Sequence, residues 1–389
     1  MRGDGFHIHK ALLPLSWLYG IGVQLRNMMF NIGILKQRSF DVPVISVGNI
    51  TVGGTGKTPH VEYLVDLLRS QFRVAVLSRG YKRSSRGFVL AGADTHAADI
   101  GDEPYQIKQK FPDVTVAVDK KRCHGIDELM ALDCGIDVIL LDDAYQHRYV
   151  KPGINILLVD YHRLIIDDCL LPAGRLREPL SGKNRADIVI VTKCPKELKP
   201  MDYRVVNKSM DLFPYQKLFF TSLEYGTLKP VFAEGQHTAV PDCLKSHHVL
   251  LMTGIASPRL LADDLKPQVA ELTPLTFGDH HSFTANDVHR INEAFTALPS
   301  PRCIVTTEKD AARLEQVEGL SSEVRSSIYS LPIKICFLLE QVNIFNNQII
   351  GYVQKNSRNS ILVKRKDDHK SQDSHRAGDR PRTISFRNN

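Results

Sequence analysis

The chain contains the stretch Val42-Pro-Val-Ile-Ser-Val-Gly-Asn-Ile-Thr-Val-Gly-Gly-Thr-Gly-Lys-Thr58, from which much of its architecture follows. A β-rich run enters a glycine loop, and residues 59–69 continue with a helical pattern. In this context the backbone N–H groups of the loop point at phosphate oxygens, while Lys57 reaches the β- and γ-phosphates and Thr58 binds Mg²⁺. The residues predicted to bind a nucleoside triphosphate are Thr51, Val52, Gly53, Gly54, Thr55, Gly56, Lys57 and Thr58. Thr51 stands where the usual motif has its first glycine.

Short apolar runs recur through the first half of the chain, separated by helical or loop segments. They occupy residues 73–78, 114–118, 137–141, 154–160 and 186–191. Strands that are buried on both faces have this composition in parallel sheets. The pattern predicts an α/β fold: a P-loop NTPase-type, mostly parallel sheet with helices on both faces.

A smaller α/β unit is predicted to begin near His247. Its expected strands are residues 248–253 and 302–307, and its expected helices are 258–265 and 309–317. The strand-like runs 217–222 and 334–339 flank it, and we interpret them as a two-stranded connector. From about Lys355 the chain is polar and should be disordered. The predicted domains are an N-terminal helix (1–40), a larger core (41–230), a smaller domain with the returning strand (231–352) and a disordered basic tail (353–389).

The composition narrows the class of partner. The hydrophobic fraction of 43% and the charged fraction of 24% are typical of a globular protein. The net charge is +7, much of it in the tail, and no aromatic residues interleave a basic stripe. We therefore expect no nucleic-acid partner, and instead acidic small molecules or an anionic membrane surface.

The cysteines form no CxxC pair, which indicates a reducing, cytosolic setting.

The apolar segment 11–35 has two interpretations. Pro14 and several polar residues interrupt it, so it does not resemble a spanning helix. On a helix, its polar residues Gly20, Gln24, Asn27 and Asn31 fall along one narrow stripe, and the rest is apolar. This pattern fits a helix that lies in a membrane interface, and it fits equally a helix that packs on its own domain.

Two acidic pairs are candidates for chemistry. Asp142 and Asp143 end an apolar strand, which is where P-loop enzymes place a second magnesium ligand. Asp102 and Glu103 precede Pro104, and proline favours an extended residue before it, so these carboxylates are expected to point to different sides. One of them could then accept a hydroxyl proton while the other serves the metal, although a helix cap is an equally ordinary use of such a pair.

Basic patches and a histidine pair complete the candidates. The patches are Ser78-Arg-Gly-Tyr-Lys-Arg83, Lys120-Lys-Arg122 and Leu171-Pro-Ala-Gly-Arg-Leu-Arg-Glu-Pro179. Arginines near a phosphoryl group neutralise developing charge or bind an anionic substrate. The histidines of Phe277-Gly-Asp-His-His-Ser282 could orient a carboxylate or relay a proton, and they could equally be surface residues.

These motifs together resemble one family, the tetraacyldisaccharide 4′-kinases of lipid A biosynthesis, which are membrane-associated bacterial P-loop kinases. The resemblance is carried, in order, by Ser46-Val-Gly-Asn49, Val52-Gly-Gly-Thr-Gly-Lys-Thr-Pro59, Leu77-Ser-Arg-Gly-Tyr-Lys-Arg83, Gly101-Asp-Glu-Pro104, Leu141-Asp-Asp-Ala-Tyr-Gln-His-Arg148, the 171–179 patch and Thr306-Thr-Glu-Lys-Asp310. Ala144 replaces a glycine of the family pattern.

The resemblance implies roles for individual residues. Asp102 matches the catalytic base, and His280 matches the histidine that pairs with it from the smaller domain, with His281 as a rival for that role. Lys57 and Arg122 match the basic groups on the phosphates. The residues that match the surroundings of Mg²⁺ are Thr58, Glu103, Asp142 and Asp143. His147 matches a motif residue without an assigned role.

The resemblance also implies an activity and a location. ATP and Mg²⁺ would serve to phosphorylate the 4′-hydroxyl of a tetraacyldisaccharide 1-phosphate, the lipid A disaccharide precursor. The enzyme would be a peripheral monomer on the anionic surface of the bacterial inner membrane, at its cytoplasmic face, which favours the anchoring interpretation of segment 11–35. Two alternatives are a partitioning-type ATPase and a nucleotide-sensing membrane adaptor without enzymatic activity.

Overall fold

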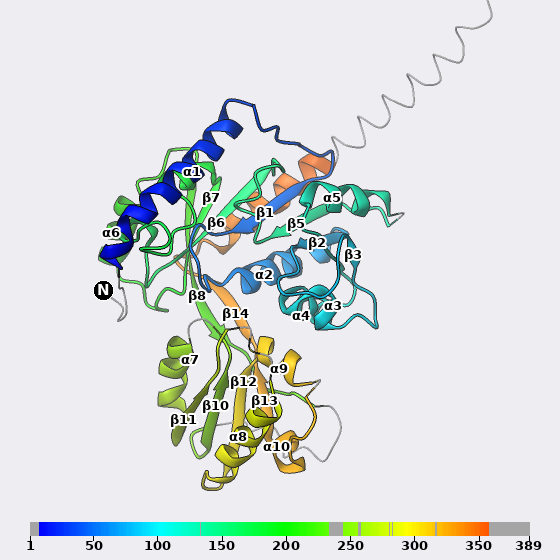
Figure 1. Ribbon diagram of the computed structural model, residues 1–389, viewed down its shortest axis with the longest axis vertical. Coiled ribbons are helices and arrows are strands. Elements are labelled where there is room, and N and C mark those ends of the chain that lie inside the picture. Colours follow the sequence, from blue (N-terminus) through cyan, green and yellow to red (C-terminus); the bar gives the residue numbers. More distant parts are fainter. Residues whose placement is uncertain are drawn as a thin grey trace, which may run out of the picture.

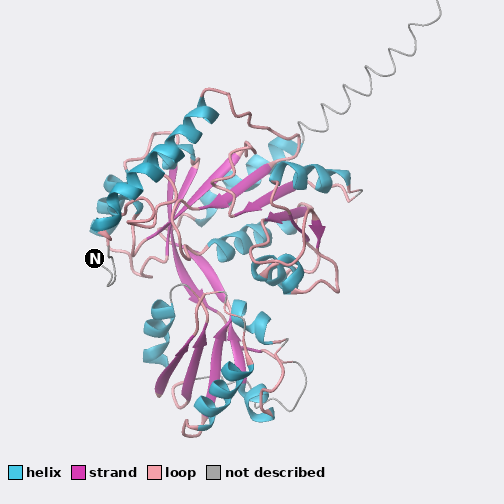
Figure 2. Ribbon diagram, in the orientation of Figure 1, coloured by secondary structure: helices cyan, strands magenta, loops and turns pink. Residues whose placement is uncertain are grey.

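A computed structural model of the chain describes residues 8–132, 134–232, 244–255, 258–279, 281, 283–315 and 317–357, and the structural statements below refer to these residues. They form two α/β units, each built around its own sheet and joined by a pair of strands (Figures 1 and 2). The predicted fold class, with its two-stranded connector, is confirmed.

The larger unit is built on a sheet with the strand order β14-β8-β7-β6-β1-β5-β2-β4-β3. Its strands are β1 (Val44–Gly48), β2 (Val74–Ser78), β3 (Val89–Leu90), β4 (Thr115–Val118), β5 (Val138–Asp142), β6 (Ile154–Asp160), β7 (Ile188–Thr192), β8 (Lys217–Tyr225) and β14 (Ile333–Phe337). All neighbours pair in parallel except β3 with β4 and β14 with β8. Every residue of β1, β2, β5 and β7 is buried, as continuous apolar runs require in a sheet covered on both faces.

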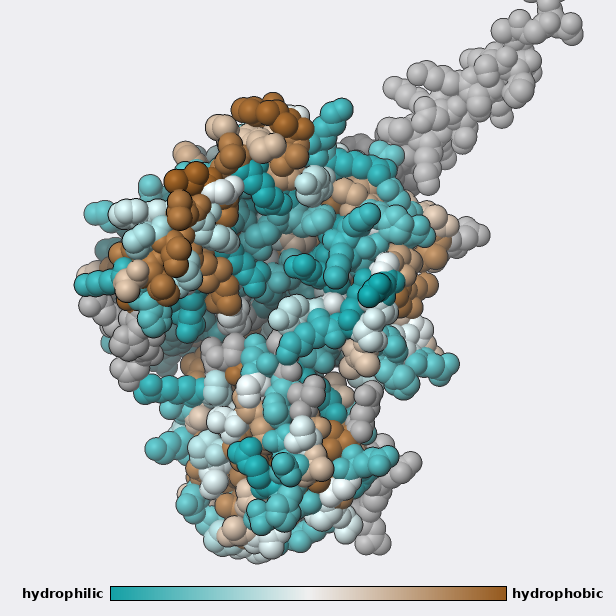
Figure 3. All heavy atoms as spheres, in the orientation of Figure 1, coloured by the Kyte–Doolittle hydropathy of each residue, from teal (hydrophilic) through white to brown (hydrophobic). Residues whose placement is uncertain are grey.

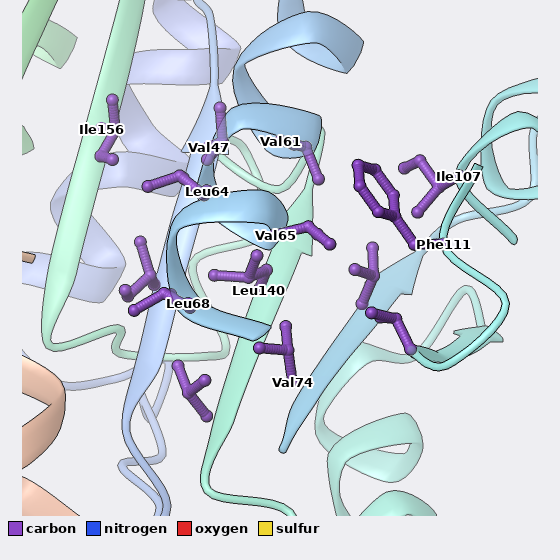
Figure 4. Close-up of a cluster of buried hydrophobic side chains, with 14 of the residues drawn as sticks. Val47, Val61, Leu64, Val65, Leu68, Val74, Ile107, Phe111, Leu140 and Ile156 are labelled. Atoms are coloured by element: carbon purple, nitrogen blue, oxygen red, sulfur yellow. The ribbon is translucent and has the colours of Figure 1, made fainter. Parts of the chain in front are cut away.

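Alternate residues of these strands enter cores on opposite faces of the sheet. On one face lie α2 (Lys57–Arg69) and α4 (Asp102–Lys110), and Figure 4 shows Leu64 and Leu68 of α2 over Leu140 of β5. The other face carries α5 (Arg122–Ala131) and α6 (Pro200–Met210), which belong to separate apolar clusters. The short helices are η1 (Lys10–Leu12), α3 (Ala97–Ile100), η2 (Ile165–Asp167), η3 (Leu180–Arg185) and η4 (Lys266–Gln268).

The smaller unit has a sheet of order β11-β10-β12-β13-β9. Its strands are β9 (Lys229–Pro230), β10 (His248–Thr253), β11 (Glu271–Thr276), β12 (Arg302–Thr307) and β13 (Ile328–Leu331). Its helices are α7 (Pro258–Leu265), α8 (Ala285–Thr296), α9 (Glu308–Leu314) and α10 (Ser322–Ser327). β10, α7, β12 and α9 coincide with predicted elements, whereas β11, α8 and α10 were not predicted.

The connector is a direct continuation of the larger sheet. The first half of β8 pairs with β7, from Lys217 to Phe220, and its second half pairs with β14, from Thr221 to Tyr225. The chain therefore leaves the larger unit along β8 and returns to it along β14.

The segment after β14 lies in a different place from the one predicted. Residues 342–357 are helical, and Phe345, Ile349 and Val353 are fully buried in the same core as α2. The sequence analysis assigned the chain up to residue 352 to the smaller domain and began the tail at 353. Apolar residues spaced four apart on a helix share one face, and this spacing places the helix against the larger sheet. The predicted tail beyond residue 357 lies outside the described residues.

The N-terminal helix α1 (Leu13–Asn31) lies on the larger unit and buries Ser16, Gly20 and Phe30 there. Of the predicted polar stripe, Gly20 is buried and Asn27 half-buried, whereas Gln24 and Asn31 are exposed. Arg148 donates hydrogen bonds to the Asn27 carbonyl (3.0 Å) and to Asn31 Oδ1 (2.7 Å). A Cβ on Gly20 would lie 2.7 Å from Leu170, so this helix approaches the domain closely there. The apolar side chains that remain at least half exposed are Leu15, Trp17, Leu18, Ile21, Leu25 and Met28. Figure 3 shows a band of hydrophobic residues, in brown, along α1.

No helix among the described residues is long and apolar enough to cross a membrane. α1 has polar contacts with the protein on one side and exposed apolar side chains on the other.

Candidate active site

The phosphate loop connects β1 to the first turn of α2, as predicted. Gly53 and Gly56 have φ angles of 114° and 80°, a region that side chains other than glycine rarely adopt. The loop is held from the end of β7, where Thr192 Oγ1 donates to the Thr55 carbonyl (3.0 Å) and Lys193 Nζ donates to the Gly54 carbonyl. These contacts give the loop a fixed shape. Thr192 and Lys193 were not predicted from the sequence, although their place at the end of a buried strand was a usable signal.

His60 supports the loop from inside the core. Its Nδ1 donates to the Gly56 carbonyl (2.7 Å), because a carbonyl only accepts, and its Nε2 then accepts from Thr221 Oγ1 (3.1 Å). Burial lowers the pKa of His60 from 6.5 to about 4. The imidazole is therefore neutral at physiological pH and joins the loop to β8.

We expect the free energy of unfolding to decrease as the pH falls from 6.5 toward 4. In this range His60 becomes protonated in the unfolded chain but not in the folded protein, so the unfolded state binds more protons. At a pH near 5, protonation of His60 in the unfolded chain should lower the free energy of unfolding by about 2 kcal/mol relative to pH 7. Denaturant unfolding at the two pH values measures it. In the His60→Asn variant the pH-dependent difference should shrink by this amount, and an unchanged difference would contradict the assignment.

The acidic pair follows β5, next to the phosphate loop. Lys57 Nζ lies 3.1 Å from Asp143 Oδ1, and Arg177 lies 3.6 Å from Asp143 Oδ2. Burial acts to raise the pKa of Asp143, but Lys57 and Arg177 outweigh it and the pKa is lowered. Asp143 is thus an ionised carboxylate between two cations.

Asp142 has a different environment. Its side chain is fully buried, and Oδ2 accepts a hydrogen bond from Ser78 Oγ (3.3 Å). The pKa of Asp142 is raised to about 7, first by burial and then by the carboxylates of Glu103 and Asp143. Asp142 Oδ1 is buried without a hydrogen-bond partner. An unsatisfied carboxylate oxygen among other carboxylates is a suitable ligand for a cation.

Arg122 begins α5 and is buried beside the acidic pair. It donates to the carbonyls of Asp119 (2.8 Å) and Asp142 (3.2 Å), which fixes the end of β5. Burial lowers the pKa of Arg122 to about 10, so the guanidinium still carries its charge. The role of Arg122 on the phosphates of the nucleotide stays a prediction, and its contact with the Asp142 carbonyl places it next to the acidic pair.

Asp102 and Glu103 lie in the first turn of α4, after Gly101, whose φ is 93°. The expectation of an extended conformation before Pro104 is wrong, because proline is tolerated in the first turn of a helix, where its missing N–H has no intrahelical partner. The helix N-terminus stabilises both carboxylates. Asp102 is paired with Arg313 (2.6 Å), and Glu103 lies 3.6 Å from Lys309.

The predicted histidine partner of Asp102 cannot be placed, because His280 lies outside the described residues. Its rival His281 is engaged within the smaller unit: Nε2 lies 2.8 Å from Asp287 Oδ2, and the ring stacks on Phe277. His147 is half-buried beside Tyr149, and burial with nearby arginines lowers its pKa to about 4.

The 171–179 patch packs on the phosphate loop. Val52 N donates to the Arg175 carbonyl (2.8 Å), and Arg177 N donates to the Ile50 carbonyl (2.7 Å). These backbone bonds place Arg177 beside the acidic pair, although the sequence motif is distant. Thr51 is buried and forms an isolated bridge with Leu176, so the position that departs from the usual motif forms part of this contact.

No group of three or more His, Cys, Asp or Glu side chains is arranged to hold a metal ion within the residues that the structure describes. This does not argue against the predicted Mg²⁺, because P-loop enzymes hold that ion through few protein ligands together with phosphate oxygens and water.

Comparison with known proteins identifies the family of the chain. A family model described as Tetraacyldisaccharide-1-P 4'-kinase matches residues 8–354. The chain is 58% identical over 363 residues to the tetraacyldisaccharide 4'-kinase of Phocaeicola vulgatus, covering 92% of this chain and 99% of that protein. It is 44% identical over 358 residues to that of Porphyromonas gingivalis, covering 90% and 99%.

The fold also resembles a solved structure. LpxK from Aquifex aeolicus, crystallised as an "apo" form in complex with ATP, matches with a TM-score of 0.67 and 30% sequence identity. The match covers 89% of this chain and 99% of that chain. The similarity therefore extends over both α/β units, and not only over the phosphate loop. The chain belongs to the tetraacyldisaccharide-1-P 4'-kinase family.

Proposed function

We propose that this protein transfers the γ-phosphoryl group of ATP to the 4′-hydroxyl of a tetraacyldisaccharide 1-phosphate. The observation that carries the proposal is the full-length similarity to tetraacyldisaccharide 4'-kinases. The geometry supports it, because the phosphate loop, the acidic pair and the carboxylates of α4 occupy one region. Lys57 contacts Asp143, and Glu103 is near enough to raise the pKa of Asp142.

The roles of the residues follow from their environments. The loop from Thr51 to Thr58 binds the phosphates, with Lys57 at the β- and γ-phosphates. Arg122 is the second proposed cation on the phosphates, and its bond to the Asp142 carbonyl holds it next to the acidic pair. Asp102 accepts the proton of the acceptor hydroxyl, and His280 is its proposed partner. Phosphoryl transfer depends mainly on such positioning and charge stabilisation.

Mg²⁺ would be held by Thr58, Glu103, Asp142 and Asp143, together with phosphate oxygens. The buried, unsatisfied Asp142 Oδ1 fits a cation. When bound, the ion neutralises charge on the phosphates during transfer. The protein's own contribution is to hold these carboxylates at the ends of β5 and α4.

The decisive experiment incubates the protein with labelled ATP and a tetraacyldisaccharide 1-phosphate, and separates the products by thin-layer chromatography. We expect labelled lipid to form only when protein, acceptor and Mg²⁺ are all present. Label released solely as inorganic phosphate would contradict the kinase and support a partitioning-type ATPase. Nucleotide binding without any turnover would support a nucleotide-sensing adaptor.

We also propose that the protein is a peripheral monomer on the anionic, cytoplasmic face of the inner membrane. The exposed apolar side chains of α1 support the membrane contact. The polar stripe of α1 is occupied by contacts such as Arg148 with Asn31, which leaves side chains such as Trp17 and Leu18 for the bilayer. A lipid acceptor has its sugar at the membrane surface, so an enzyme held there meets it directly.

Replacing Trp17, Leu18 and Ile21 together by asparagine is expected to weaken binding to anionic vesicles at least about tenfold, because these side chains lose their apolar transfer energy. Liposome flotation measures the binding, and turnover on a detergent-dispersed acceptor should change little. Deleting residues 1–36 should weaken flotation as well. A triple variant that floats like the wild type would remove α1 from the membrane contact.

A further inference from the structure

Arg313 connects the smaller unit to the proposed catalytic base. It lies on α9 and donates two hydrogen bonds to Asp102 at the start of α4, from Nη2 (2.6 Å) and from Nε (3.1 Å). Both bonds end on the same oxygen, Oδ2, so Oδ1 receives neither of them. Two bonds from a planar guanidinium restrict the rotation of a carboxylate more than a single contact does.

Arg313 is itself held firmly. Its side chain is only 9% exposed, and Nη1 donates to Asp310 Oδ1 (2.9 Å). The other oxygen of Asp310 accepts from Gly254 N (2.9 Å) and from Thr307 Oγ1 (2.7 Å). Asp310 is fully buried, so it fixes the guanidinium to the ends of β10 and β12. The orientation of Asp102 is thus tied to the frame of the smaller unit.

We propose that Arg313 is a positioning residue for the reaction: it orients the Asp102 carboxylate through Oδ2 so that the base is correctly aimed only while the smaller unit is docked. This inference rests on the proposed function, in which Asp102 is the base. It adds a residue that bonds the base from the other unit, and it gives the α4–α9 contact a role in the chemistry.

The alternative role of Arg313 is purely structural, namely to hold the two units together. Another ion pair in the α4–α9 contact allows a direct test of this alternative: Lys110 of α4 lies 3.2 Å from Glu308 of α9. Lys110 also pairs with Glu62 on α2 (2.7 Å), so removing Glu308 leaves it a partner. Glu308→Ala therefore removes a bond between the units without touching Asp102, and it is the matched control.

The experiment measures kcat and KM for ATP in the lipid phosphorylation assay. We expect Arg313→Ala to lower kcat at least about 30-fold with KM for ATP changed less than about threefold, as for loss of an interaction that matters in the transition state. Guanidinium ions at millimolar concentration should restore part of kcat, whereas equal sodium chloride should not. Glu308→Ala should keep kcat within about threefold of the wild type.

Several outcomes would overturn the proposal. They are a wild-type kcat in Arg313→Ala, an equal loss of kcat in Glu308→Ala, and a change confined to KM. Thermal unfolding shows whether the variants fold. If Arg313→Ala does not, Arg313→Lys carries the test, since lysine keeps the charge but not the planar pair of donors. Its kcat should be intermediate, and a wild-type kcat would refute orientation by the guanidinium.

A double variant separates this inference from the proposed function. If Arg313 acts through Asp102, adding Arg313→Ala to Asp102→Ala should lower kcat by no more than about twofold beyond the single change. Additive losses would show that Arg313 acts elsewhere, while the kinase assignment would stand. A wild-type kcat in Asp102→Ala alone would instead remove the base itself, and the positioning role with it.

Discussion

Asp102→Ala is expected to lower kcat for lipid phosphorylation by roughly 10²- to 10⁴-fold, the range for loss of a general base. ATP affinity should remain within a few fold, because the phosphates are held by the loop between β1 and α2 and not by α4. The measurement combines single-turnover transfer of labelled phosphate with calorimetric titration of ATP.

A matched control for Asp102 lies just beyond the other end of α4. Asp113 is an exposed carboxylate paired with Arg69 at 3.4 Å, and Asp113→Ala should retain turnover close to that of the wild type. If Asp102→Ala kept full turnover, the base assignment would be wrong. If it lost ATP affinity instead, Asp102 would belong to the nucleotide site.

Lys57→Ala is expected to raise the Kd for ATP more than about tenfold and to lower kcat by about 10² or more, because the loop loses its cation at the β- and γ-phosphates. Asp143, now 3.1 Å from Lys57, would keep the more distant Arg177 as its ion-pair partner. Titration with ATP and the lipid assay measure the two effects separately. Lys151→Ala changes an exposed lysine of the same unit and should alter neither. Unchanged ATP affinity in Lys57→Ala would contradict the nucleotide-binding role of the loop.

The sequence predicted elements well where burial alone determines them. β1, β2, β5 and β7 are buried at every residue, so their apolar runs were unambiguous. β11 was missed because it lies at the edge of its sheet and is half exposed, which removes the continuous apolar signal. The final helix was missed although its buried residues, Phe345, Ile349 and Val353, have the four-residue spacing of an amphipathic helix.

The residues of the candidate site also differ in how well the sequence predicted them. Lys57 lies in the glycine loop motif, and Asp142 and Asp143 stand at the end of β5, so local patterns were enough to select them. Arg313 and Asp102 are 211 positions apart, and nothing in either local pattern specifies the pairing. Arg122 was selected as a charge, but the local pattern did not show that its side chain is buried against the carbonyls of Asp119 and Asp142.

The path of the chain through β8 and β14 has a consequence for biosynthesis. The smaller unit is one continuous segment between these strands, so it can fold as soon as it leaves the ribosome. The larger sheet must wait, because its edge strand β14 and the helix of residues 342–357 are translated last. Until then, the apolar surface that Phe345 and Ile349 will cover is open to water. The nascent chain is therefore most prone to aggregate, and most in need of a chaperone, while this sheet is incomplete.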